Sequence, residues 1–305
     1  MDRTDRELRL AVRRQRLSAA AREALDARLR GERVADRPSC VVPLAAGEGA
    51  PLFCVHPAGG DVLGYSAVAR HALRPHWGLQ APGLVGEAQP DTIPALAERY
   101  ADAVDAVAPA GPVLLAGWSL GAHVAFEMGR ALTARGRAPA LIALIDADPE
   151  VPDPESLPAP GDPVPWLRSI AEYVERIGGR PLGWEVDALD PPHSLRERFL
   201  AALRHADPAL AGVGASPERL ERLIAVFEAN TRALARYRPE PSDGPLTLLQ
   251  CRDSSFADGW AARTRGSLAV HAIPGDHYTL VVEPNAAVLA RTLESLARAA
   301  TSEGA

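Results

Sequence analysis

Short apolar runs recur along the chain, separated by longer segments in which apolar residues return every three or four positions. The short runs are typical of buried strands, and the longer segments are typical of amphipathic helices, as at 93–107. Between residues 51 and 146 the two patterns alternate, which favours a mostly parallel sheet flanked by helices on both faces. We predict strands at 52–55, 113–116, 140–145, 246–251 and 268–273, and a final helix at 284–299.

The alternation stops between Pro149 and Pro241. Seven prolines punctuate the start of this segment, and helical patterns continue to residue 241 with no strand-like run. The clearest helix runs from Pro217 to Tyr237, with Ser216 as its N-cap and a proline at its first position. A helical insertion that follows a strand end lies over the carboxyl edge of the sheet, where ligands bind. We therefore predict a lid over about 149–241, rather than padding at the edge of the sheet.

Residues 1–45 form a predicted helical leader or linker that precedes a single domain at 46–305. Thr4 to Glu7 match a capping box, Ser18 can cap a second helix, and Gly31 can end it. The leader is rich in arginine. A linker between domains and an arm folded on the domain surface fit this pattern equally well.

The sequence Gly-Trp-Ser-Leu-Gly at 117–121 follows a predicted strand and opens a predicted helix. This is the G-x-S-x-G pattern of a nucleophile elbow in the strand–turn–helix context that the pattern requires. Glycines flank the serine because the turn is too tight for a Cβ on either side. Ser119 is therefore the predicted nucleophile.

A hydrolase of this type needs a base and an acid after the serine, in the order serine, acid, histidine. His277 lies in a polar turn directly after the last predicted strand, where its ring can reach the elbow, and is the predicted base. Asp146 and Asp253 each follow a predicted strand, and Asp148 is a weaker third candidate for the acid. Spacing alone leaves Asp146 and Asp253 open.

The other histidines are expected to be structural or exposed. His123 lies one helical turn beyond the serine, so its side chain should point along the helix. His271 falls within a strand pattern, and the others lie among surface-like polar residues (His71, His76, His193, His205).

From about Pro51 to Ala299 the chain resembles a thioesterase domain of nonribosomal peptide synthetases, a branch of the α/β-hydrolases. Five blocks carry the resemblance: 53–60, 78–84, 117–121 with 125–127, 144–146, and 275–278. The resemblance implies that Asp146 is the triad acid, with Asp253 in reserve. It also implies an oxyanion hole formed by the backbone N–H of Leu120 and that of Ala58 or Gly59.

The resemblance implies a thioesterase that releases a peptidyl or acyl chain by hydrolysis or macrocyclisation through a Ser119 acyl-enzyme. The chain needs no cofactor of its own, because a partner carrier protein or upstream synthetase module carries the phosphopantetheine. Trp166 and Trp184 in the lid are candidates for the acyl pocket, although a lid core also explains them. A free-standing editing thioesterase, a small-molecule esterase and a non-catalytic docking module remain as alternatives.

Composition and net charge limit the classes of partner that we expect. The 305 residues are 47% hydrophobic and 24% charged, as in globular proteins, and all the basic residues other than histidine are arginine. The net charge of −6 gives no electrostatic case for nucleic acid or a membrane surface. Three cysteines without metal-binding spacing, and a start without the apolar core of a signal peptide, favour the cytoplasm.

Overall fold

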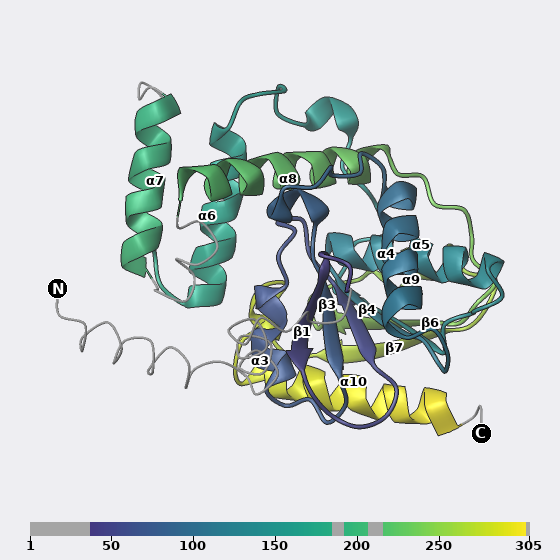
Figure 1. Cartoon of the computed structure of the whole chain (residues 1–305). Coiled ribbons are helices and arrows are strands. Elements are labelled where there is room, and N and C mark those ends of the chain that lie inside the picture. Colours follow the sequence, from purple (N-terminus) through teal and green to yellow (C-terminus); the bar gives the residue numbers. More distant parts are fainter. Residues whose placement is uncertain (1–36, 185–191, 207–215, 303–305) are drawn as a thin grey trace.

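The structure is a computed structural model that describes residues 37–184, 192–206 and 216–302 (Figure 1). Its strands are β1 (Val41–Ala45), β2 (Leu52–Val55), β3 (His76–Leu79), β4 (Leu114–Trp118), β5 (Leu141–Ile145), β6 (Leu246–Cys251) and β7 (Leu268–Ile273). They form one sheet in the order β1-β3-β2-β4-β5-β6-β7. Strand β1 is antiparallel to β3, and every other neighbouring pair is parallel.

Helices cover both faces of this sheet (Figure 1). They are α3 (Ser66–Ala69), α4 (Ile93–Val107), α5 (Leu120–Ala134), α9 (Ala257–Ala261) and α10 (Asn285–Ser302). One hydrophobic core joins the sheet to α4, α5 and α9, and a second joins its other face to α3 and α10. Strands β2, β4 and β5 are buried at every position. This explains why their sequences are continuous apolar runs and not alternating patterns.

The helical insertion between β5 and β6 contains α6 (Val164–Gly178), α7 (Pro192–Ala206) and α8 (Pro217–Arg236), which we call the lid helices. They share a hydrophobic core of their own. In Figure 1, α8 crosses above the sheet, while α6 and α7 lie at one end of it. The predicted cap of α8 is present, since the Ser216 side chain accepts a hydrogen bond from the N–H of Arg219 at 3.3 Å.

The structure corrects the sequence analysis at two strands. Strand β3 was not predicted, and His76 at its start is buried rather than surface-like. Burial lowers the pKa of His76, whose Nδ1 lies 3.1 Å from the carbonyl oxygen of Arg74. Strand β1 shows that 41–45 belong to the sheet and not to the leader, and the predicted leader helices lie outside the described residues.

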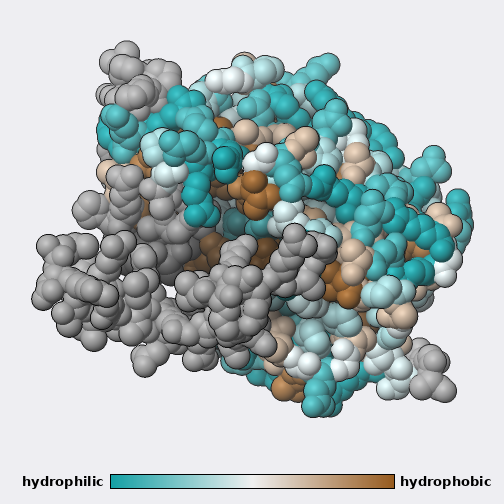
Figure 2. Space-filling model, viewed as in Figure 1, coloured by the Kyte–Doolittle hydropathy of each residue, from teal (hydrophilic) through white to brown (hydrophobic). Residues whose placement is uncertain are grey.

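Two features of the described residues bear on the kind of site to expect. Their helices are all too short or too polar to span a bilayer. Histidine, cysteine and carboxylate side chains gather nowhere among them in a group of three or more that could hold a metal ion. Figure 2 shows a mostly hydrophilic face, on which the visible hydrophobic residues gather in the middle, beneath α8.

Candidate active site

Ser119 occupies a strained turn between β4 and α5. Its φ is +58° and its ψ is −127°, a backbone conformation that residues with a side chain rarely adopt. The flanking glycines allow the turn to close: a Cβ on Gly117 would lie 2.0 Å from the carbonyl oxygen of Gly121. A Cβ on Gly121 would lie 2.5 Å from the carbonyl oxygen of Val55 on β2. Both glycines of the elbow are therefore required by contacts with the backbone.

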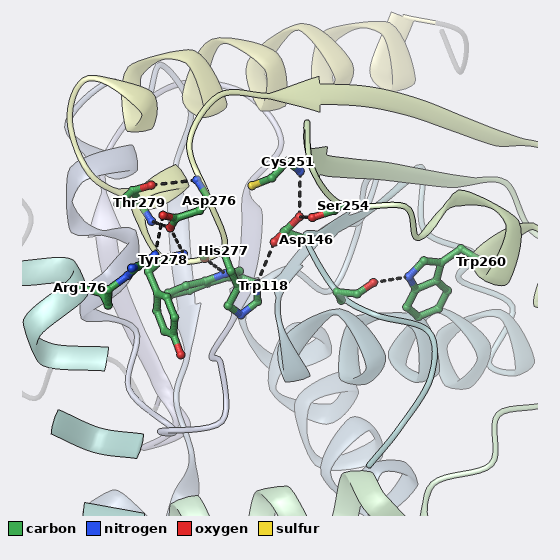
Figure 3. Close-up of polar contacts among 11 residues, drawn as sticks. Trp118, Asp146, Arg176, Cys251, Ser254, Trp260, Asp276, His277, Tyr278 and Thr279 are labelled. Atoms are coloured by element: carbon green, nitrogen blue, oxygen red, sulfur yellow. Dashed lines mark hydrogen bonds and ion pairs between the residues drawn. The ribbon is translucent and has the colours of Figure 1, made fainter. Parts of the chain in front are cut away.

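His277 lies on the loop after β7, where neighbouring side chains fix its backbone (Figure 3). The indole N–H of Trp118 donates to the His277 carbonyl oxygen at 3.0 Å. Asp276 accepts hydrogen bonds from the N–H groups of Tyr278 and Thr279, both at 3.0 Å, which closes the turn around the histidine. The side chain of His277 stays 38% exposed, so a substrate can reach its ring.

Asp146 directly follows β5 with a φ of +41°, and its carboxylate is almost fully buried. Its Oδ2 lies 2.9 Å from Nδ1 of His277. Its Oδ1 accepts from the N–H of Cys251 and from the hydroxyl of Ser254, each at 2.8 Å (Figure 3). Burial raises the pKa of Asp146, but these three hydrogen bonds outweigh burial and hold the pKa below its usual value. The group is therefore a fixed carboxylate at neutral pH.

The structure separates the two candidate acids. Asp146 contacts His277, whereas Asp253 is exposed to solvent. Its neighbour Ser254 turns inward and donates to Asp146 instead. Ser254 was not predicted from the sequence, where its place beside Asp253 was the only available signal.

Ser119, Asp146 and His277 line one cavity of about 490 Å³. Leu120, the first residue of α5, lines it too, and the first N–H groups of a helix have no partner within the helix. Together with the positive end of the helix dipole, this N–H favours a negative charge next to Ser119. The serine, the histidine and one predicted oxyanion donor therefore face the same space.

The other predicted oxyanion donors lie in the turn after β2. Gly60 closes this turn by donating to the carbonyl oxygen of Pro57 at 2.9 Å, and its φ is +83°. Within the described part of the chain, the N–H groups of Ala58 and Gly59 donate to no protein group. Both groups are free to bind a ligand atom.

His123 and His56 are buried histidines near the site, and both have neutral rings. Nε2 of His123 lies 2.9 Å from the carbonyl oxygen of Asp148, so this ring helps to hold the loop that follows Asp146. The indole N–H of Trp260 holds the same loop by donating to the Ala147 carbonyl oxygen at 2.7 Å (Figure 3). Burial lowers the pKa of His123 and of His56 to about 4, which keeps both rings neutral at pH 7.

Trp166 and Trp184 do not line the serine cavity. Trp166 is 3% exposed and packs beside Phe227 in the core of the lid helices, and the Trp184 ring lies 4.8 Å from that of Phe199. The structure thus places both residues in or against the lid core, which is the alternative that the sequence also allowed, and a contact of either tryptophan with substrate stays a prediction. A small, almost entirely apolar cavity lies between the turn after β2 and the lid helices. Its walls include Gly59, Ile170, Tyr173, Leu223 and Phe227.

Comparison with known proteins finds a thioesterase family and several multidomain synthetases. A family model described as Thioesterase domain matches residues 50–296. Nonribosomal peptide synthetase pngA of Aspergillus terreus is 25% identical over 268 residues, which make up 80% of this chain and 27% of the synthetase. A solved four-domain nonribosomal peptide synthetase, holo-AB3403 bound to AMP and glycine, matches with a TM-score of 0.74. This match is 27% identical and covers 90% of this chain and 21% of that one.

The wild-type Vlm2 thioesterase domain matches with a TM-score of 0.62 at 25% identity, over 84% of this chain and 96% of that domain. This chain therefore spans about a quarter of the fungal synthetase and about a fifth of the four-domain synthetase. It is similar to nearly the whole of an isolated domain and to only one part of the multidomain proteins.

Proposed function

Because the chain belongs to the thioesterase-domain family and has the α/β-hydrolase fold, we propose that Ser119, His277 and Asp146 act as a catalytic triad. The reaction we propose is release of an acyl or peptidyl chain from the phosphopantetheine arm of a carrier protein. The observation that carries the proposal is the 2.9 Å contact between His277 Nδ1 and Asp146 Oδ2, in a cavity that Ser119 also lines.

In the first step the Ser119 hydroxyl attacks the carbonyl carbon of the thioester. His277 accepts the hydroxyl proton at Nε2, because its Nδ1 carries the proton that is shared with Asp146. The resulting oxyanion accepts hydrogen bonds from the N–H of Leu120 and from the turn at 57–60. The carbon–sulfur bond then breaks, and the departing thiolate takes the proton from His277. The products are a free thiol and an ester on Ser119.

In the second step a nucleophile attacks the Ser119 ester. His277 removes the proton of this nucleophile and passes it to the Ser119 oxygen as the ester bond breaks. Water gives a free acid, whereas an amine or hydroxyl within the bound chain gives a macrocycle. The apolar cavity beside Gly59, with a volume of about 40 Å³, has room for one small apolar substituent of that chain, which its apolar wall stabilises. Cyclisation competes with hydrolysis where the lid helices exclude water best.

The proposed partner is a separate carrier protein or an upstream synthetase module, and the enzyme needs no cofactor of its own. In this proposal Ser119, the serine of the elbow, acts as the catalytic nucleophile. The arginine-rich residues 1–45 are proposed to assist the encounter with an acidic carrier. We place the reaction in the cytoplasm, in keeping with three free cysteines.

The test compares one acyl group presented on a phosphopantetheinyl carrier protein and on N-acetylcysteamine. We expect release from both, a higher kcat/KM for the carrier, and no release by Ser119→Ala. A serine-directed phosphonate should label the wild-type protein and not this variant. Equal kcat/KM for the matching oxygen ester and the thioester would favour a small-molecule esterase instead. Activity retained by Ser119→Ala would remove the triad from the mechanism.

A further inference from the structure

One buried amide connects a lid helix to the turn that carries the predicted oxyanion donors. Asn230 lies on α8 and is 1% exposed. Its Nδ2 donates to the carbonyl oxygen of Ala58 at 2.9 Å, and its Oδ1 accepts from Nε2 of Gln89 at 2.8 Å. Gln89 Oε1 in turn accepts from the N–H of Gly83 at 3.0 Å.

Backbone groups at both ends fix the direction of this chain of hydrogen bonds. The Ala58 carbonyl can only accept, so the NH₂ group of Asn230 must face it. The Gly83 N–H can only donate, so the carbonyl group of Gln89 must face that end. Both amide orientations follow from these two constraints, and every polar atom in the chain is used.

The Ala58 carbonyl belongs to the same planar peptide unit as the N–H of Gly59. In a trans peptide these two groups point in opposite directions. A hydrogen bond that holds the carbonyl towards α8 therefore holds the Gly59 N–H away from α8. The same hydrogen bond fixes the plane of the Ala58–Gly59 peptide, which adjoins the N–H of Ala58, the other predicted donor.

This peptide unit is the central one of the turn from Pro57 to Gly60, and glycine makes it easy to flip. A flip between type I and type II turns leaves the ends of the turn in place and requires positive φ at the third residue, here Gly59. Gly59 is not at positive φ in the structure, although Gly60 is, at +83°. Because glycine adopts positive φ at little cost, the residue itself does not prevent the flip.

Other side chains of α8 press on the same turn. A Cβ added to Gly60 would lie 2.5 Å from Cγ1 of Val226, and one added to Gly59 would lie 4.0 Å from the ring of Phe227. The helix is thus seated directly on the turn, so the Asn230 amide is held at a fixed distance from it.

We propose that Asn230 is a positioning residue, which holds the Ala58–Gly59 peptide in the orientation that presents its N–H to the oxyanion. This proposal rests on the proposed thioesterase function. It gives α8 a role in catalysis besides covering the substrate, because the helix sets the geometry of the oxyanion hole.

The first test measures kcat and KM of Asn230→Ala on a small acyl thioester. We expect kcat to fall by about 10- to 100-fold with KM little changed, somewhat less than for complete loss of an oxyanion donor. The matched control is Leu220→Ala, also buried on α8 but within the lid core. It should lower the melting temperature and leave kcat close to that of the wild type. If Asn230→Ala does not fold, Gln89→Leu tests the same chain of hydrogen bonds at a half-buried position. We expect Gln89→Leu to lower kcat less than Asn230→Ala.

The second test is a double-mutant cycle with Gly59→Ala. A Cβ at Gly59 has room, with its nearest neighbour, Asp61 Oδ2, at 3.4 Å, and alanine disfavours the positive φ of the flipped turn. Asn230→Ala should therefore cost less kcat in the Gly59→Ala background than in the wild type.

Equal costs in both backgrounds, or a rise in KM with kcat unchanged, would overturn the positioning role. The two proposals fail separately. If Ser119→Ala is inactive while Asn230→Ala keeps the wild-type kcat, only the role of Asn230 is lost. If Ser119→Ala keeps its activity, the thioesterase mechanism itself is wrong.

Discussion

Replacing Asp146 by asparagine tests the triad with almost no change in shape. Oδ1 of Asp146 accepts from the Cys251 N–H and the Ser254 hydroxyl, so the amide oxygen of an asparagine must take that position. The opposite orientation would place an NH₂ group against the buried Cys251 N–H and leave that N–H unsatisfied, at a cost of about 1–3 kcal/mol. The amide NH₂ therefore faces His277.

An NH₂ group facing Nδ1 of His277 reverses the tautomer of the ring. Nδ1 must then accept, so the proton moves to Nε2, and Nε2 can no longer take the proton of Ser119. We expect kcat to fall about 10⁴-fold, as when the buried carboxylate of a serine triad is replaced in this way. At about 1.36 kcal/mol per tenfold change in rate, this loss equals about 5.4 kcal/mol of transition-state stabilisation.

The assay is steady-state hydrolysis of an N-acetylcysteamine thioester, with Asp253→Asn as the matched control because Asp253 is exposed. The control should keep nearly the full kcat. Nitrogen-15 NMR of the histidines should show the His277 proton on Nδ1 in the wild type and on Nε2 in Asp146→Asn. If Asp146→Asn kept a tenth of the wild-type kcat while Asp253→Asn lost most of it, our assignment of the acid would be refuted.

Three further predictions concern the elbow, the lid and pH. Gly117→Ala should destabilise the fold by several kcal/mol in urea titrations, more than the usual ~1–3 kcal/mol of overpacking, because its Cβ would meet backbone at 2.0 Å; Gly244→Ala, where the nearest atom would lie at 3.9 Å, should be close to neutral. Phe227→Ala, in the wall of the apolar cavity, should change the acyl chains accepted, whereas Trp166→Ala should lower the melting temperature with the same chain preference; identical preferences in both variants would exclude the cavity as the acyl site. His56 and His123 have a pKa of about 4 in the folded protein and near 6.5 in the unfolded chain. Below pH 6.5 the unfolded state therefore binds more protons than the folded state. The free energy of unfolding should therefore fall as pH falls from about 6.5 to about 4, by up to about 1.4 kcal/mol per pH unit for each ring, and urea titrations at pH 7 and 5 that gave equal values would contradict this.

Local sequence was enough to predict the elbow and most of the sheet. The apolar runs that became β2, β4 and β5 are buried at every position, and β6 is buried at most of its positions, so burial accounts for their apolar residues. The run that became β7 was also predicted, although only Ile273 in it is buried. The elbow was predicted because its pattern is local, and Gly117 is required by a contact with the carbonyl oxygen of Gly121 in the same turn. The contact that requires Gly121 is with Val55 on β2, which only the folded structure shows. The bounds predicted for α4, 93–107, match the helix as observed, since its cap and its apolar stripe are both local.

Strand β3 was not predicted because it begins with a polar residue, His76, whose burial accompanies the pairing of β3 with two other strands, β1 and β2. The two tryptophans of the lid were hard to place for a similar reason. Aromatic residues in a sequence indicate burial, but they do not show which part of the protein they pack against.

Tertiary structure alone decided how the site is assembled. Asp146 and Asp253 are the same residue type after two neighbouring parallel strands, and only the folded structure shows that Asp146 contacts His277 while Asp253 is exposed. The contacts of Ser254 with Asp146 and of Asn230 with Ala58 join residues 108 and 172 positions apart. A short segment of sequence indicates which residues are buried and where the backbone turns, because burial and turn geometry constrain each segment separately. The partner of a polar side chain depends on how the segments pack together, and that is determined only when the whole chain has folded.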